Sequence, residues 1–354
     1  MSGPGEFSAG VKCTYMLSSQ KLPYEKWVEQ TTGKYNGKVT KTDQLQIQNL
    51  TIHWSLIEGP ISAFLAAAEL PNNRSINIEV IQATYELNIA EKVFKKILKT
   101  LNYNVDNSIK TGNEIVSEIK SKGIDTFTKE DNEQSCFFIT DSRNRNIGFT
   151  IDLFYDSNSA DQSNIRAATQ LYMGGFRAQE QVTLFQSDNH LQQYTWNSET
   201  NTRNGRTGTE IVLDESGTIN VTTETDRKPE RINYDNGSGI IPGIFLEPLI
   251  NHIVQNNIQQ AVVDTIEASG NITPMLISVD PNSSNTERAK YIVTLDFMDG
   301  TNISEQVYLN EEKQITKIIL QQDRIYIFQR TDLESIAKEF PDQAMNISQI
   351  SEAL

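Results

Sequence analysis

The sequence predicts an α+β protein: a long antiparallel meander sheet, curved as in a half-barrel and packed on a few helices, follows a smaller mixed α/β region. Three observations predict this class. From Ser135 onward, strand-like runs recur about every 10–15 residues, and Asn, Ser, Asp and Gly fill the connections between them. This spacing is typical of antiparallel hairpins, not of alternating β-α-β units. Helical and strand patterns alternate before Ser135, and one apolar helix over 241–256 interrupts the meander.

The length of 354 residues suggests about two domains. The opening Met-Ser-Gly-Pro-Gly-Glu-Phe reads as a vector-encoded tag remnant, so we expect that a native signal or anchor preceded the chain. The expected divisions are a tag remnant over 1–10, a mixed strand and helix region over 11–141, a β-rich domain over 142–340 and a polar tail over 341–354.

The first part of the chain shows both strand-like and helix-like patterns of apolar residues. Residues 44–54 alternate apolar and polar side chains, as a half-buried strand does. Pro60 then suits a helix start, and a short helix is expected to follow it. The apolar face of that helix would consist of Ile61, Phe64, Leu65 and Ala68. Residues 75–85 read as a strand.

The strongest helical pattern covers 88–102, with Asn88 as the cap and Glu91 three residues later. Its expected inward residues are Ile89, Val93, Phe94, Ile97, Leu98 and Leu101. Lysines at 92, 95, 96 and 99 occupy the other face, which is either a plain solvated face or a surface for a membrane or an acidic partner. A second helix is expected over 113–122, ending at Gly123.

The later elements close the meander. Pro248 should kink the inserted helix or mark a second start. Strands are expected over 262–268, 275–279, 291–297, 304–308, 314–320 and 324–329. Thr331 and Glu334 form a capping box for a last helix, with Leu333, Ile336, Ala337 and Phe340 inward.

Charge and composition exclude several classes. The net charge of −15 and the lack of basic runs argue against a nucleic-acid partner. The longest mostly apolar stretch, 61–70, is too short for a transmembrane segment. Cys13 and Cys136 leave open one disulfide or two free thiols, and no Cys/His cluster indicates zinc. We therefore expect no cofactor.

No catalytic motif is present. The three histidines, His53, His190 and His252, are interpreted as structural or surface residues. Asp152, Asp156, Asn158 and Asp161 have the oxygens that calcium prefers, but their spacing does not fit an EF-hand, so a solvated turn is the better interpretation and no metal site is predicted.

Residues 208–340 resemble the bacterial periplasmic lipoprotein-carrier-like half-barrel proteins. The resemblance rests on the inserted helix at 241–254 and on the late strands at 291–297 and 307–318. It implies an unclosed barrel around a hydrophobic cavity that carries or senses acyl chains, without catalytic residues. Residues 75–141 have no counterpart in that group.

The expected function is that of a non-enzymatic extracytoplasmic binding protein of the bacterial periplasm or cell envelope. An apolar small molecule or lipid would lie between the sheet and the inserted helix, against Phe245, Leu246, Leu249, Ile250 and Ile253. An equally supported alternative is that these five side chains fill a closed core and bind no ligand. The alternatives are a structural or protein-interaction module of an envelope assembly, using exposed strand edges, and a carboxylate-based enzyme acting on polysaccharide.

Overall fold

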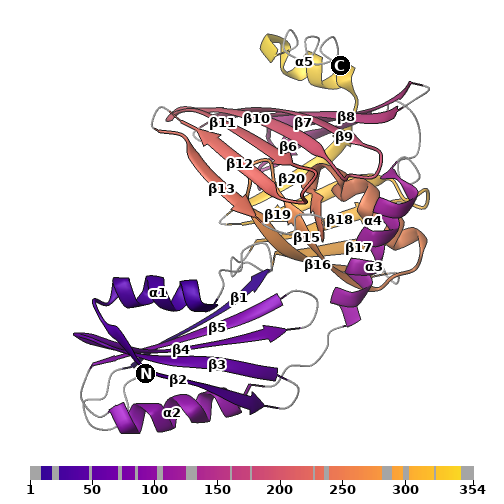
Figure 1. Ribbon diagram of the computed structural model, residues 1–354. Helices are drawn as coiled ribbons and strands as arrows, with labels where there is room; N and C mark the ends of the chain where they lie inside the picture. The colour runs from indigo at the N-terminus through magenta and orange to yellow at the C-terminus, as the bar shows by residue number, and fades with distance from the viewer. Residues whose placement is uncertain are drawn as a thin grey trace. The chain divides into compact units, whose positions relative to one another are not determined.

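The computed structural model describes residues 9–17, 24–47, 50–70, 74–83, 87–101, 107–124, 134–159, 162–175, 178–225, 228–234, 239–280, 289–297, 303–322 and 324–343. The chain divides into two compact units, residues 1–106 (unit 1) and residues 107–354 (unit 2) (Figure 1). The boundary between the units comes earlier than the one expected at 141/142, because residues 107–122 pack on the second sheet and residues 134–140 pair within it.

Unit 1 is a five-stranded antiparallel sheet in the order β1-β5-β4-β3-β2. Helix α1 covers one face and α2 the other (Figure 1). The elements are β1 (Ala9–Leu17), α1 (Tyr24–Lys34), β2 (Lys38–Ile47), β3 (Leu50–Glu58), β4 (Ile61–Leu70), β5 (Arg74–Ala83) and α2 (Leu87–Lys99).

The prediction of a helix after Pro60 is wrong, because residues 61–70 form the central strand β4. Strands β3 and β5 pair with it on either side, and helices cover both of its faces. A strand that is buried on both faces needs no polar alternation, so its continuous apolar run looks like a buried helix in the sequence. Phe64 packs against Phe94 of α2 with ring centroids 5.1 Å apart.

Helix α2 is confirmed, but its cap and its inward face differ from the expectation. The helix begins at Leu87, so Asn88 lies inside its first turn, and Glu91 pairs with lysines instead of closing a capping box. Phe94 and Leu98 are buried as expected, whereas Ile89 and Val93 are exposed. The apolar side chains therefore cover a wider arc around α2 than the side of the helix that packs on the sheet.

Unit 2 contains one fifteen-stranded sheet, confirming the predicted meander. Its strand order is β13-β12-β11-β10-β9-β8-β7-β6-β20-β19-β18-β17-β16-β15-β14, so β13 and β14 are the edges and the sheet is not closed. The first strands are β6 (Gln134–Thr140), β7 (Asn146–Ser159), β8 (Gln162–Met173), β9 (Gln179–Asp188), β10 (Tyr194–Thr202), β11 (Gly205–Leu213), β12 (Ile219–Glu224) and β13 (Glu230–Tyr234). The others are β14 (Ile240–Pro242), β15 (Gln260–Ile266), β16 (Ile272–Asp280), β17 (Tyr291–Phe297), β18 (Ser304–Leu309), β19 (Ile315–Gln321) and β20 (Ile325–Thr331).

The sheet consists of two meanders joined edge to edge. Strands β6 to β13 follow one another by hairpins, as do β15 to β20, and an antiparallel pairing of β20 with β6 joins the two sets. The sheet also bends strongly. A Cβ built on Gly270, in the β15–β16 turn, would lie only 2.4 Å from Cγ1 of Val221 on β12. Strands near opposite edges of the sheet therefore approach each other.

Three α-helices accompany this sheet in the described part of unit 2. Helix α3 (Asn107–Lys122) packs along β15, with Ile115, Val116 and Ile119 buried as expected and Gly123 in a left-handed conformation (φ 92°). It begins six residues before the expected start at 113.

The expected helix over 241–256 is shorter than predicted. Its first residues form β14 and a 3₁₀ turn, Gly243–Phe245, before α4 (Leu246–Gln255). Pro248 lies in the first turn of α4, where backbone N–H groups have no intrahelical partner, so it causes no break. Strand β14 runs parallel to β15 because α4 connects them.

Helix α5 (Leu333–Glu339) and a following 3₁₀ turn, Pro341–Gln343, end the described chain. The cap of α5 is Asp332 instead of Thr331: its carboxylate accepts a hydrogen bond from the backbone N–H of Ser335 at 2.7 Å. Ile336 and Phe340 pack on β6, β7 and β8 as expected of the inward face. No helix in the described ranges is long and apolar enough to cross a membrane.

Candidate functional site

The residues predicted to bind an apolar ligand lie where α4 meets the sheet. Phe245, Leu249, Ile250 and Ile253 are almost completely buried, and Leu246 is partly exposed. Phe245 packs edge-on against Phe185 of β9, with ring centroids 5.1 Å apart, and against Phe154 of β7 at 5.9 Å. These side chains are held in protein contacts, and their role in ligand binding remains a prediction.

We call the sheet face that contacts Phe245 the inner face. Phe185 is the centre of an aromatic cluster there, because Tyr194 and Trp196 of β10 also pack on its ring, at 5.4 and 6.1 Å. Helix α5 packs on the opposite face, around Phe149 and Ile151. The inner face therefore carries aromatic side chains beside α4.

Next to the aromatic cluster, strand register aligns small polar side chains into one continuous row on the inner face. Each member is the direct cross-strand partner of the next, so side chains point to the same side of the sheet. This polar row runs across six neighbouring strands, β6 to β11, and consists of Ser135, Asp152, Thr169, Thr183, Ser198 and Thr209.

Asp152 is the acidic member of the polar row. Its carboxylate accepts a hydrogen bond from the Thr169 hydroxyl at 2.7 Å. Burial raises the pKa of Asp152 from 3.8 to about 6, and the Thr169 hydrogen bond only partly opposes this shift. Many protein atoms surround the carboxyl group, but the residue as a whole is only partly shielded from solvent. A carboxyl of this kind can exchange a proton near neutral pH.

A second acid reaches the polar row from α4. The Ser135 hydroxyl donates to Oε2 of Glu247 at 3.3 Å, and Arg330 of β20 lies 3.9 Å from Oε1 of the same carboxylate. Ser135 is also the direct strand partner of Asp152. The sheet and the inserted helix thus bring two carboxyl groups next to one serine.

Several buried polar atoms on the inner face and on α4 have no hydrogen-bond partner within the described ranges. They are Oγ1 of Thr183, the hydroxyl of Tyr194, Nε1 of Trp196 and Oδ1 of Asn251, in residues at most 7% exposed. Asn251 follows Glu247 by one helical turn on α4. Buried polar groups in folded proteins almost always have a partner, in protein, water or ligand. These atoms remain able to form hydrogen bonds with water or with a ligand.

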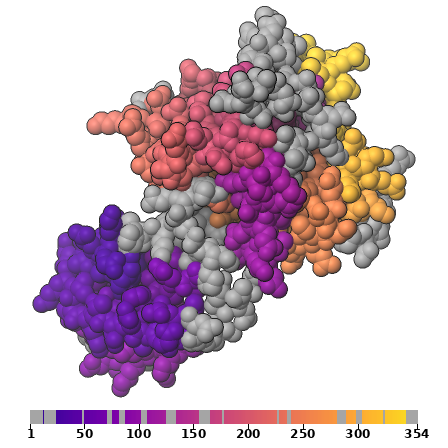
Figure 2. All heavy atoms as spheres, turned by 45° about the vertical axis from the view of Figure 1, so that its right-hand side comes forward, coloured from indigo at the N-terminus to yellow at the C-terminus, as the bar shows by residue number. Residues whose placement is uncertain are grey.

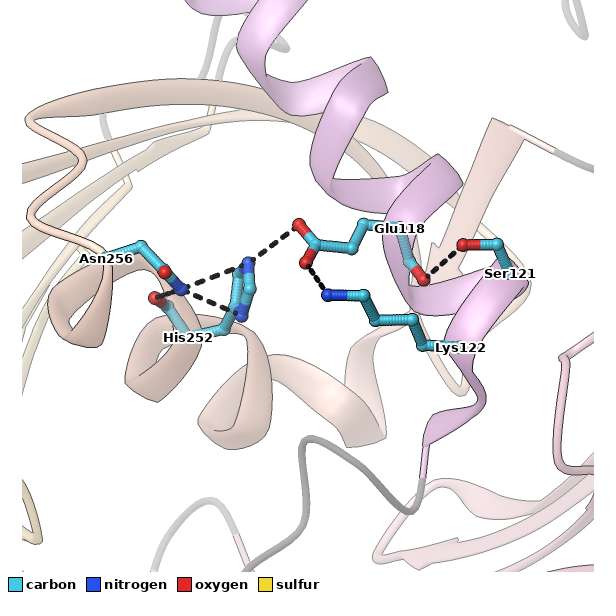
Figure 3. Close-up of polar contacts among 5 residues, drawn as sticks. All are labelled: Glu118, Ser121, Lys122, His252 and Asn256. Atoms are coloured by element: carbon cyan, nitrogen blue, oxygen red, sulfur yellow. Dashed lines mark hydrogen bonds and ion pairs between the residues drawn. The ribbon is translucent and has the colours of Figure 1, made fainter.

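Helix α4 is fixed against α3 by a polar network (Figure 3). Nε2 of His252 lies 3.5 Å from Oε2 of Glu118, whose other oxygen accepts from Lys122 at 2.6 Å. The Asn256 amide donates to the His252 carbonyl at 2.9 Å. Burial lowers the pKa of His252 although Glu118 opposes the shift, so the imidazole favours its neutral form.

The remaining sequence candidates do not form a catalytic group. His53 shares the less buried side of β3 with Thr51, as the alternation indicated. Nδ1 of His190 contacts the Lys120 carbonyl at 2.8 Å, at the end of α3. His53 contacts the Gln44 amide, with 3.1 Å between Nδ1 and Nε2, so both histidines have structural contacts, as His252 does.

The acidic segment expected to be a solvated turn is mostly strand. Asp152 lies on the inner face of β7, Asp156 and Asn158 also belong to β7, and Asp161 is outside the described residues. Across the described residues, no group of three or more His, Cys, Asp or Glu side chains could hold a metal ion. Cys136 is a free, buried thiol, and burial raises its pKa to about 11.

One further acid with a raised pKa escaped sequence analysis. Glu305 of β18 is the strand partner of Leu295 and Leu320, and burial together with the charge of Glu267 raises its pKa to about 7. The polar row also escaped it, since its members come from six strands and only the register aligns them. A signal existed in the period-two spacing of Tyr194, Trp196 and Ser198, which puts an aromatic pair and a hydroxyl on one face of β10.

Neither family models nor curated proteins match this chain. Among solved structures, the chain is similar to the crystal structure of a β-barrel-like protein, a domain of unknown function (DUF1849) from Brucella abortus. The two share 12% sequence identity with a TM-score of 0.40, over 58% of this chain and 97% of that one.

Proposed function

We propose that the chain is a non-enzymatic, extracytoplasmic binding protein of the bacterial envelope, and that unit 2 holds a lipid between α4 and the inner face. The observation that carries the proposal is the set of buried, unpartnered polar atoms at Thr183, Tyr194, Trp196 and Asn251, beside an aromatic cluster. An amphipathic molecule would place its apolar part against the aromatic rings and its head group on the polar row.

The chemistry of these atoms favours a neutral head group that bears hydroxyls. Nε1 of Trp196 can only donate a hydrogen bond, and Oδ1 of Asn251 can only accept one. A hydroxyl group does both and would satisfy either atom. The ionised form of Asp152 would repel an anionic head group such as a carboxylate or phosphate. A glycerol or sugar head group fits best.

Native mass spectrometry of the purified protein, followed by organic extraction, tests whether a lipid accompanies it. A stoichiometric neutral lipid is the expected result. The extracted protein is then titrated calorimetrically with n-octyl glucoside below its micellar concentration and with octanoate. We expect saturable binding of the glucoside, weaker binding of octanoate, and loss of glucoside affinity in Thr183→Val. Equal binding of both probes, unaffected by the substitution, would contradict the proposal.

A second candidate is a carboxylate-based enzyme acting on polysaccharide. It is favoured by Asp152 and Glu247 both lying next to Ser135, with Trp196 on the same face. A carboxyl with a raised pKa can serve as a general acid in glycoside hydrolysis. Assays on a panel of nitrophenyl glycosides distinguish the two candidates: turnover abolished by Asp152→Asn would support the enzyme and displace the binding proposal.

A further inference from the structure

The outward side of α2 in unit 1 combines exposed apolar and basic side chains. At 100° per residue, Ile89, Lys92, Val93, Lys96 and Lys99 fall within an arc of about 120°. The core-facing side is opposite, where Ala90, Phe94 and Leu98 are buried. In Figure 2 the helix lies at the lower surface of unit 1. We call this set of five residues the α2 face.

Two apolar side chains on the α2 face are unusually open to solvent. Ile89 is 50% exposed and Val93 is 42% exposed, and they lie one helical turn apart. The helix does not need them for packing, because a separate apolar side already contacts the sheet. An exposed pair of β-branched side chains on a helix surface is available to an external apolar phase.

The charges of the α2 face have one sign. Its three lysines have no ion-pair partner among the described residues, and it contains no acid. Glu91, the only acid of the helix, is engaged by Lys41 at 2.7 Å and Lys95 at 2.8 Å, away from the α2 face. These two lysines neutralise it, so the α2 face keeps its positive charge.

The distribution of charge along the chain reinforces this local asymmetry. Residues 1–106 contain 11 Lys and Arg against 10 Asp and Glu, a net charge of +1. The remaining residues carry −16, so the acidity of the chain lies entirely in unit 2. Taken by itself, unit 1 therefore has no excess of negative charge that would oppose the positive charge of the α2 face.

We propose that the α2 face binds the surface of an anionic phospholipid membrane. Ile89 and Val93 would enter the boundary between head groups and acyl chains, and the lysines would lie on the lipid phosphates. Lysine is depleted from protein interfaces, and their energetic anchors are usually Trp, Tyr and Arg, none of which the α2 face contains. A membrane is therefore a better partner than an acidic protein.

Vesicle flotation of the full chain tests this proposal, with vesicles of phosphatidylcholine alone and of phosphatidylcholine with 30% phosphatidylglycerol. We expect binding only to the anionic vesicles, weakening in 0.5 M NaCl. The triple variant Lys92→Gln, Lys96→Gln, Lys99→Gln should lose about tenfold or more in binding. A matched triple variant at exposed lysines elsewhere, Lys26→Gln, Lys228→Gln, Lys338→Gln, changes net charge equally and should bind within about twofold of wild type.

The double variant Ile89→Ser, Val93→Ser tests the apolar component. All substituted residues are exposed, so circular dichroism should show an unchanged fold. Binding should fall while its salt dependence persists. The proposal fails if the wild-type protein does not bind anionic vesicles, or if the α2 triple variant binds them as well as the matched control does. It also fails if the serine variant binds normally and soluble polyglutamate competes fully, which would indicate an acidic protein partner.

Discussion

Two threonines that are direct strand partners on the polar row differ in what their hydroxyls contact. Thr169 donates to Asp152, whereas Thr183 has no partner within the described part of the chain. Valine has nearly the same shape as threonine, so Thr183→Val should change the free energy of unfolding by less than about 0.5 kcal/mol or stabilise the protein. Thr169→Val removes a hydrogen bond to a carboxylate and should cost about 1.5–3 kcal/mol. Urea unfolding of both variants measures the contrast; equal losses would mean that Thr183 is bonded within the protein.

Asp152 should make the stability of the protein depend on pH. Its pKa is about 6 in the folded protein and about 3.8 when unfolded, so the folded state binds more protons between these values. Stability therefore falls as pH rises from about 4 to 6, by up to about 3 kcal/mol at 1.36 kcal/mol per unit. Asp152→Asn abolishes this contribution, so the variant should gain stability relative to wild type as pH rises.

Urea midpoints of wild type and Asp152→Asn at pH 4 and pH 7 give the difference directly. Glu305 also titrates in this range, with a pKa of about 7, but it is present in both proteins and cancels in the comparison. Parallel pH profiles for the two proteins would show that Asp152 is not desolvated in the folded state.

At the scale of elements, the sequence predicted most strands and helices of unit 2 but failed where local pattern and tertiary burial differ. The strand expected over 291–297 coincides with β17, because its apolar residues alternate on a half-buried sheet. The run over 61–70 was misassigned because two covering helices remove that alternation from β4. In α5, Thr331 and Asp332 are adjacent capping residues, and which of them caps depends on where β20 ends.

The packing of α3 on β15 depends on Gly112. A Cβ on this residue would lie 1.8 Å from the Val262 carbonyl oxygen, so alanine requires the helix and strand to separate. Overpacking of this kind typically costs about 1–3 kcal/mol, which should outweigh the gain of about 1 kcal/mol that alanine brings to a helix. Gly112→Ala should therefore destabilise unit 2.

Gly33 of α1 provides the matched control, since a Cβ there meets nothing within 4 Å. Gly33→Ala should leave stability unchanged or raise it. Thermal unfolding followed by circular dichroism compares the two substitutions. An equally benign Gly112→Ala would show that α3 is not in close contact with β15 in solution.

For the whole molecule, long-range register determines both the candidate site and the shape of the sheet. The polar row requires five successive strand pairings, and a shift of one residue in any pairing would send its members to the opposite face. No local pattern encodes that alignment. The sequence could suggest a covered, curved sheet with an inserted helix, but not which polar side chains would gather beneath it.

Substitutions at the contact of Gly270 with Val221 test the curvature of the sheet. Gly270 (φ 85°) and Gly217 (φ 80°) both occupy hairpin turns in the left-handed region, where alanine costs about 1–2 kcal/mol. A Cβ on Gly217 meets nothing within 4 Å, whereas one on Gly270 would press on the Val221 side chain. Gly270→Ala should therefore destabilise unit 2 by about 1–3 kcal/mol more than Gly217→Ala.

Val221→Ala vacates the space that the new Cβ needs, so the double variant should be less destabilised than the sum of its two single variants. A coupling of at least about 0.5 kcal/mol in this double-mutant cycle would be evidence that the β15–β16 turn rests on β12. Strict additivity, with equal costs at Gly270 and Gly217, would mean that these strands stay apart in solution. The inner face would then be open to solvent on that side, and buried polar atoms such as Nε1 of Trp196 could be satisfied by water without any ligand.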